Sequence, residues 1–132
     1  MTTQLMKDFD QWNEDKKRID AQKSGRLYRA REIWWCKLGT NVGFEQDGTG
    51  AGYARPVLVL KAFSAHVCLV VPLSTSSKRN HFYQDIGKIS GEDAVAIISQ
   101  IRLVDTRRLE NKICVLDHTM FEVIKKAVKD MF

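Results

Sequence analysis

Apolar and polar residues follow one period near the start of the chain and another from about residue 30 onward. Over residues 4–23 the apolar positions recur at helical spacing, and charged residues occupy the other sides. Those apolar positions are Leu5, Phe9, Trp12 and Ile19. The pattern predicts an amphipathic helix that ends at a left-handed cap on Gly25. We expect its apolar stripe to pack on the main body; the alternative is an arm that binds a partner or guides RNA.

Short apolar runs replace the helical period from residue 31. They predict strands over residues 31–38, 55–63, 66–73, 81–89, 94–104 and 112–116. The first run alternates and predicts a half-buried strand, whereas the second and third are separated by a short turn and predict a hairpin. Pro56 has no amide hydrogen to donate, so it belongs at the start of a strand or on an edge strand.

The segment from residue 117 predicts a closing helix. Its apolar stripe consists of Phe121, Ile124, Val128 and Met131. Asp117 is a suitable N-cap, and a capping box formed by Thr119 and Glu122 is the alternative start. Several short strands followed by a helix predict a mainly β fold with α-helices (α+β): a small, strongly curved antiparallel sheet or barrel with helices at its sides.

Size, charge and cysteine content narrow the class of protein. With 132 residues, a net charge of +5 and 44% hydrophobic residues, the chain predicts one globular domain with a preference for polyanionic partners. Cys36, Cys68 and Cys114 form no CxxC pair, so we expect reduced thiols rather than a zinc site. No signal peptide or apolar run long enough to span a membrane is present, which predicts a cytoplasmic protein.

The glycine-rich stretch GFEQDGTGAGYARPVLVL, residues 43–60, resembles a phosphate loop only in spacing. A P-loop requires lysine after its second conserved glycine and a helix after that, but Thr49 follows Gly48 and the next residues favour a strand. The arginine at the end of the loop, Arg55, is the better candidate for binding phosphate because its guanidinium is a rigid fork of donors. A surface salt bridge is the alternative role for Arg55.

Other candidate groups are hydroxyls rather than metal ligands. Residues 74–77 read STSS after a predicted strand, where hydroxyls and free amides could donate to an anion or could simply form a turn. The three histidines have no metal-ligand spacing, and no GxSxG motif is present. Arginine and hydroxyl groups beside glycine-rich loops are typical of phosphate chemistry.

Five motifs in one order resemble the MazF/PemK family, the toxin endoribonucleases of bacterial type II toxin-antitoxin systems. They are REIWW, GFEQ, RPVLVL, VVPLSTSSK and SQIRLVDTRRL, and an Asp-capped terminal helix follows them. The resemblance covers residues 29–132 and leaves residues 1–28 as a helical extension. It implies an SH3-like barrel of the CcdB-PemK type that forms a homodimer and cleaves single-stranded RNA, with messenger RNA the expected target. No metal or cofactor is implied: the 2′-hydroxyl attacks the phosphorus and leaves 2′,3′-cyclic phosphate and 5′-hydroxyl ends.

The resemblance also assigns roles to individual residues. Arg55 matches the active-site arginine, and Ser74, or Thr75 if the register differs by one, matches the active-site hydroxyl. Residues matched to supporting positions, or expected beside the RNA backbone, are Glu45, Gln46, Lys78, Arg79, Gln100 and Arg102. Phe44 and Ser99 stand where some members carry a histidine and an acidic residue, so an acid-base scheme based on those two positions is unavailable.

The implied partners explain the basic charge. RNA phosphates and the acidic, disordered tail of a cognate antitoxin would bind the same groove, and operator DNA would be reached only through the antitoxin. Two other functions suit the same barrel: a growth-inhibiting poison that binds gyrase without catalysis, and a basic module that only binds RNA.

Overall fold

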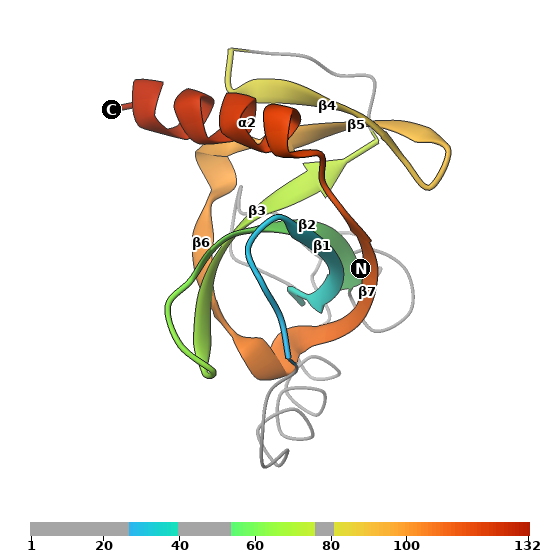
Figure 1. Cartoon of the computed structure of the whole chain (residues 1–132), viewed down its shortest axis with the longest axis vertical. Helices are drawn as coiled ribbons and strands as arrows, with labels where there is room; N and C mark the ends of the chain where they lie inside the picture. The colour runs from blue at the N-terminus through green and yellow to red at the C-terminus, as the bar shows by residue number, and fades with distance from the viewer. Residues whose placement is uncertain (1–26, 40–53, 76–80) are drawn as a thin grey trace, which may run out of the picture.

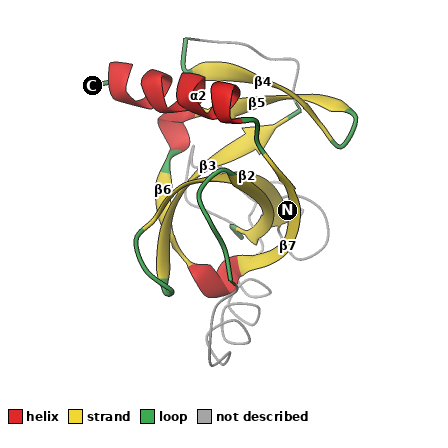
Figure 2. Cartoon of the chain, viewed as in Figure 1, coloured by secondary structure: helices red, strands yellow, loops and turns green. Residues whose placement is uncertain are grey.

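The computed structural model describes residues 27–39, 54–75 and 81–132 (Figure 1). The predicted helix over residues 4–23 and the candidate residues Glu45, Gln46, Lys78 and Arg79 lie outside the described residues. Within the described part, strands form most of the molecule and a single α-helix closes the chain (Figure 2).

Seven antiparallel strands form one strongly curved sheet. They are β1 (Glu32–Lys37), β2 (Ala54–Ala62), β3 (Val67–Ser74), β4 (Tyr83–Ile89), β5 (Glu92–Ile97), β6 (Arg102–Asp105) and β7 (Leu109–Val115). The order across the sheet is β4-β5-β3-β2-β1-β7, and β6 also pairs with β3. This arrangement confirms the predicted fold class, and β7 begins earlier than the predicted strand over residues 112–116.

The central strands carry buried residues on both faces. On β1 and β2, the paired residues Ile33 and Leu58 belong to a hydrophobic core shared with the C-terminal helix. Their neighbours Trp34 and Val57, also a pair, belong to a second core inside the curl of the sheet. Two buried faces explain the continuous apolar run of residues 57–60, because neither face needs polar side chains. The predicted half-buried strand over residues 31–38 holds from Trp34 to Lys37, where buried and accessible residues alternate, but not from Glu32 to Trp34, which are all buried.

β2 and β3 form the predicted hairpin, and Val57 pairs with Pro72 at the end of the hairpin that is far from its turn. Pro56 is the third residue of β2, which confirms its place near a strand start. β2 lies between β1 and β3, however, so it is not an edge strand.

The predicted strand over residues 94–104 is interrupted. β5 ends at Ile97, a 3-10 helix η2 (Ile98–Gln100) follows, and β6 begins at Arg102. Along one edge of β3, Val70 pairs with Arg102 and Leu73 pairs with Ala96, so the four residues 70–73 lie opposite the seven residues 96–102. η2 takes up the surplus residues, so a single continuous strand was a wrong prediction.

The C-terminal helix α2 (His118–Asp130) begins where the sequence predicts. The Asp117 carboxylate accepts a hydrogen bond from the Met120 amide at 3.2 Å, which makes Asp117 the N-cap and overturns the alternative capping box. Phe121 and Ile124 are buried in the core that also contains residues of β4 and β5, and α2 lies alongside these two strands in Figure 1. α2 therefore fixes the β4–β5 hairpin against the rest of the sheet.

The described cysteines are free thiols, and two of them lie in the core. Burial raises the pKa of Cys36 to about 12 and that of Cys68 to about 11, so both stay protonated at neutral pH. Cys36 and Cys68 thus serve as small apolar side chains within the second core. No helix among the described residues is both long and apolar enough to cross a bilayer.

Candidate active site

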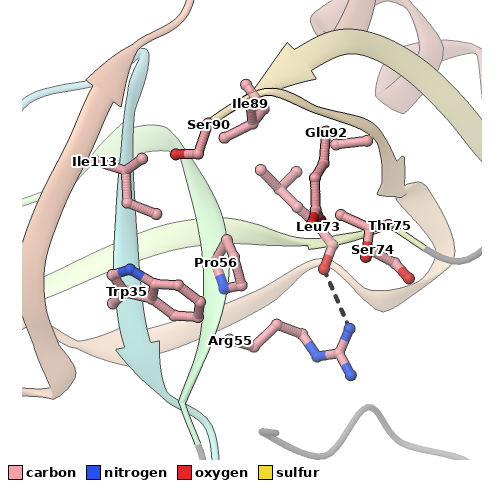
Figure 3. Close-up of a pocket in the computed structure, with 11 residues that line it drawn as sticks. Trp35, Arg55, Pro56, Leu73, Ser74, Thr75, Ile89, Ser90, Glu92 and Ile113 are labelled. Atoms are coloured by element: carbon pink, nitrogen blue, oxygen red, sulfur yellow. Dashed lines mark hydrogen bonds between the residues drawn. The ribbon is translucent and has the colours of Figure 1, made fainter. Parts of the chain in front are cut away.

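A pocket of about 620 Å³ opens where β2 begins and β3 ends. Because these strands are antiparallel neighbours, the start of one lies beside the end of the other. This geometry brings together the three residues predicted to be catalytic. The described residues that line the pocket are Trp35, Arg55, Pro56, Leu73, Ser74, Thr75, Ile89, Ser90, Glu92, Ala94 and Ile113 (Figure 3).

Arg55 reaches across from β2 to β3. It is the second residue of its strand, pairs with Cys36 of β1 and is partly buried. Its Nη1 donates a hydrogen bond to the main-chain oxygen of Leu73 at 3.2 Å (Figure 3). The guanidinium is therefore held at the end of β3, next to the residues that carry hydroxyl groups.

Three hydroxyl groups line the pocket. Ser74 is the last residue of β3 and pairs with Val95 of β5, so its backbone is fixed by the sheet. Thr75 follows directly and is exposed. Ser90 lies in the turn between β4 and β5. Hydroxyls beside a guanidinium can donate hydrogen bonds to the oxygens of a phosphate group.

An apolar wall completes one side of the pocket. The Trp35 side chain is 42% exposed, whereas its neighbour Trp34 is buried in the inner core. Trp35 lies beside Pro56, its partner in the β1–β2 pairing, and Ile113 is on the same side (Figure 3). An exposed indole on a rigid strand offers a flat surface on which a nucleic-acid base can stack.

Glu92 supplies a negative charge opposite this wall. It follows the two-residue turn Ser90–Gly91, whose φ angles of 52° and 83° are typical of a tight type I′ hairpin. The turn pairs Ile89 with Glu92, so the glutamate begins β5 at a defined position. Among the described lining residues, Arg55 and Glu92 are the only two that carry charge.

Two predicted supporting residues lie elsewhere. Gln100 is in η2 rather than on a strand, which corrects the prediction. Arg102 is on β6 opposite Val70. The pKa of the Arg108 guanidinium is lowered, mainly by burial and further by the nearby positive charge of Arg102. Neither Gln100 nor Arg102 is among the described residues that line the pocket.

No group of three or more histidine, cysteine, aspartate or glutamate residues suited to a metal ion is found in residues 27–39, 54–75 and 81–132. The chemistry available on the pocket wall is thus one guanidinium, one carboxylate, three hydroxyls and an indole.

Comparison with known protein families gives a match over most of the chain. The sequence model of the PemK-like, MazF-like toxins of type II toxin-antitoxin systems matches residues 29–132. The chain belongs to this family. The match includes every described residue of the pocket. No curated protein matches the sequence significantly.

Solved structures of MazF-like toxins share the fold at low sequence identity. MazF from Deinococcus radiodurans superposes with a TM-score of 0.67 at 19% identity, covering 80% of this chain and 96% of that one. The Mycobacterium tuberculosis toxin MazF-mt6 gives 0.59 at 16% identity, with coverages of 76% and 94%. An endoribonuclease solved with its cognate antitoxin from a mycobacterial species gives 0.61 at 13%, with coverages of 79% and 93%.

Three residues that bring chemistry to the pocket of this MazF-like chain were not predicted from its sequence: Trp35, Ser90 and Glu92. Trp35 had a usable signal: successive side chains of a strand point to opposite faces, so the two tryptophans of WW cannot both face one core. Glu92 follows a Ser-Gly pair between two strand-like runs, which is typical of a two-residue hairpin turn. What the sequence could not supply was the curvature that brings this turn to the end of β3.

Proposed function

We propose that this MazF-like protein is the toxin of a type II toxin-antitoxin system and an endoribonuclease that cleaves single-stranded RNA, with messenger RNA as the expected target. The 2′-hydroxyl attacks the adjacent phosphorus and leaves a 2′,3′-cyclic phosphate and a 5′-hydroxyl end, without a metal or cofactor. The observation that carries the proposal is the meeting of Arg55 with the hydroxyl-bearing residues Ser74 and Thr75 in one pocket.

The pocket suits the charge that develops during this reaction. As the phosphorus becomes pentacoordinate, negative charge builds up on its equatorial oxygens and needs donors that are already in place. Arg55, held at the end of β3 by its bond to Leu73, supplies a permanent positive charge. The hydroxyl of Ser74 or Thr75 adds a neutral donor next to it.

Binding of the rest of the RNA would involve a wider surface. The net charge of +5 favours the phosphate backbone, and Trp35 offers a stacking surface for a base beside the bond to be cleaved. Lys78 and Arg79 are proposed contacts to the RNA backbone. Glu45, Gln46, Gln100 and Arg102 keep their proposed supporting roles, the last two from positions outside the described lining of the pocket.

We further propose the partners that accompany this function. A homodimer is expected, and a cognate antitoxin would bind through an acidic segment that orders on the basic surface. The endoribonuclease relative that was solved with its cognate antitoxin supports such a partner. Operator DNA would be contacted only through the antitoxin, in the cytoplasm.

The test is to incubate the purified protein with a long single-stranded RNA in EDTA and to map the ends of the products. Cleavage is expected, with 5′ ends that polynucleotide kinase labels without prior phosphatase treatment and with cyclic phosphate at the 3′ side. Binding without cleavage would contradict the nuclease and favour a module that only binds RNA. Neither binding nor cleavage, together with inhibition of gyrase, would favour a non-catalytic poison.

A further inference from the structure

We propose that Glu92 is the general base of the cleavage reaction, accepting the proton of the attacking 2′-hydroxyl. This inference rests on the proposed function and adds a residue to the same pocket. Cleavage requires a group that removes this proton, and neither an arginine nor a serine hydroxyl is unprotonated and basic at neutral pH. Among the described residues that line the pocket, only Glu92 is a carboxylate.

The position of Glu92 fits this role. Its side chain extends from the first residue of β5 toward the end of β3. The Arg55 guanidinium approaches the same strand end (Figure 3). A phosphodiester held between Arg55 and Ser74 would place the neighbouring ribose close to this carboxylate. The tight Ser90–Gly91 turn and the pairing of Ile89 with Glu92 fix the backbone from which the side chain extends.

Arg55 is the one cationic residue among the described residues that line the pocket with Glu92. The other described residues of the lining are Trp35 of β1, Arg55 and Pro56 of β2, Leu73, Ser74 and Thr75 at the end of β3, Ile89 and Ser90 where β4 ends, Ala94 of β5 and Ile113 of β7. A cation on the far side of the phosphate would offset the repulsion between carboxylate and phosphate. One cation and one anion around a single phosphodiester can thus divide charge stabilisation and proton transfer between them.

The Glu92 carboxylate takes the 2′-hydroxyl proton while the 2′-oxygen forms a bond to phosphorus. The bond from phosphorus to the 5′-oxygen of the next nucleotide breaks, and that oxygen takes a proton from water. Arg55 neutralises the phosphorane oxygens and keeps its own protons throughout.

Asp93, the next residue, is a matched control. Successive residues of a strand point to opposite faces, and Asp93 does not line the pocket. Its carboxylate instead forms an exposed ion pair with Lys88 at 3.2 Å. Glu92→Gln and Asp93→Asn therefore each remove one carboxylate charge from neighbouring positions, only one of which is in the pocket.

The experiment compares single-turnover RNA cleavage by wild type, Glu92→Gln, Glu92→Asp and Asp93→Asn across pH, together with binding of a 2′-O-methyl RNA. Loss of a general base is expected to lower the rate for Glu92→Gln by roughly 10²–10⁴-fold. The same variant should bind RNA at least as tightly as wild type and should lose the acid limb of the pH profile. Glu92→Asp should recover part of the rate, and Asp93→Asn should match wild type.

Three results would overturn the inference. They are a wild-type rate for Glu92→Gln, an unchanged acid limb in that variant, or an equal loss of rate in Asp93→Asn. Glu45→Gln, tested in parallel, would lose the acid limb of the pH profile if Glu45 were the base instead of Glu92.

Failure of the proposed function would look different, because wild-type protein would then leave RNA uncut. Failure of the Glu92 inference alone leaves wild-type cleavage intact and sensitive to Arg55→Ala.

Discussion

The Nη1 atom of Arg55 lies 3.2 Å from the main-chain oxygen of Leu73 and donates a hydrogen bond to it. This bond joins the second residue of β2 to the penultimate residue of β3. The next residue along the chain is Ser74, so the guanidinium and a hydroxyl-bearing residue share one strand end. A side chain anchored at one nitrogen in this way is already oriented before a phosphate binds, which is the condition for stabilising a transition state efficiently.

Trp35 is predicted to bind a base by stacking. Trp35→Ala should weaken binding of a 2′-O-methyl RNA by about 1–3 kcal/mol, a factor of roughly five to more than a hundred in Kd, measured by fluorescence anisotropy. Phe63, whose side chain is 56% exposed near the β2–β3 turn and outside the pocket lining, provides the control. Equal losses of affinity in Trp35→Ala and Phe63→Ala would rule out stacking at this site.

The two hydroxyls at the end of β3 are predicted to differ in importance. Ser74 is fixed by its pairing with Val95 and directly follows the residue that holds Arg55, whereas Thr75 lies beyond the strand. Ser74→Ala should lower the cleavage rate by about 10²-fold, the scale of losing one donor to the transition state, and Thr75→Val should have the smaller effect. A larger loss in Thr75→Val would assign the active hydroxyl to Thr75 instead.

Glu32 is predicted to make stability depend on pH. Burial favours the neutral acid, but the carboxylate accepts hydrogen bonds from Trp34 Nε1 at 3.1 Å and the Arg29 amide at 2.8 Å, and Lys112 lies 3.4 Å away. These partners outweigh burial and lower the pKa of Glu32. The ionised form is therefore favoured in the folded state, and its contribution is present above the pKa of an unfolded glutamate and lost as the pH falls through the folded value.

Substitution of Glu32 tests this contribution. Glu32→Gln should reduce the free energy of unfolding at pH 7 by about 1–2 kcal/mol, and the difference from wild type should shrink below about pH 4, measured by urea denaturation at both pH values. Asp93→Asn, which removes only an exposed ion pair, should change the free energy of unfolding by less than about 0.5 kcal/mol. If the difference in free energy of unfolding between wild type and Glu32→Gln did not change with pH, stability would not depend on the ionisation of Glu32.

Local signals in the sequence predicted most elements of the fold. The cap at Asp117, the β2–β3 hairpin and the apolar stripe of α2 each depend on residues within one element or one turn. The break at η2 could not be predicted this way. Apolar residues lie on both sides of Ser99 and Gln100, and the break arises because β3 offers fewer pairing positions than the opposite segment contains.

The site was predictable only in part, for a related reason. Arg55 and Ser74 are 19 positions apart, but they lie on the two strands of one hairpin. The antiparallel pairing of these strands brings the two residues together. Glu92 comes from a different hairpin, whose position depends on the pairing of β5 with β3 and on the packing of α2. Contacts of this kind depend on the curvature of the whole sheet, which no local pattern encodes.

The most direct test of the central claim is the rate at which Arg55→Ala cleaves single-stranded RNA in EDTA, compared with wild type under single-turnover conditions. We predict a loss of roughly 10²–10³-fold with the fold intact by thermal unfolding, and wild-type products that end in 2′,3′-cyclic phosphate and 5′-hydroxyl. Cleavage by Arg55→Ala at the wild-type rate would contradict the account.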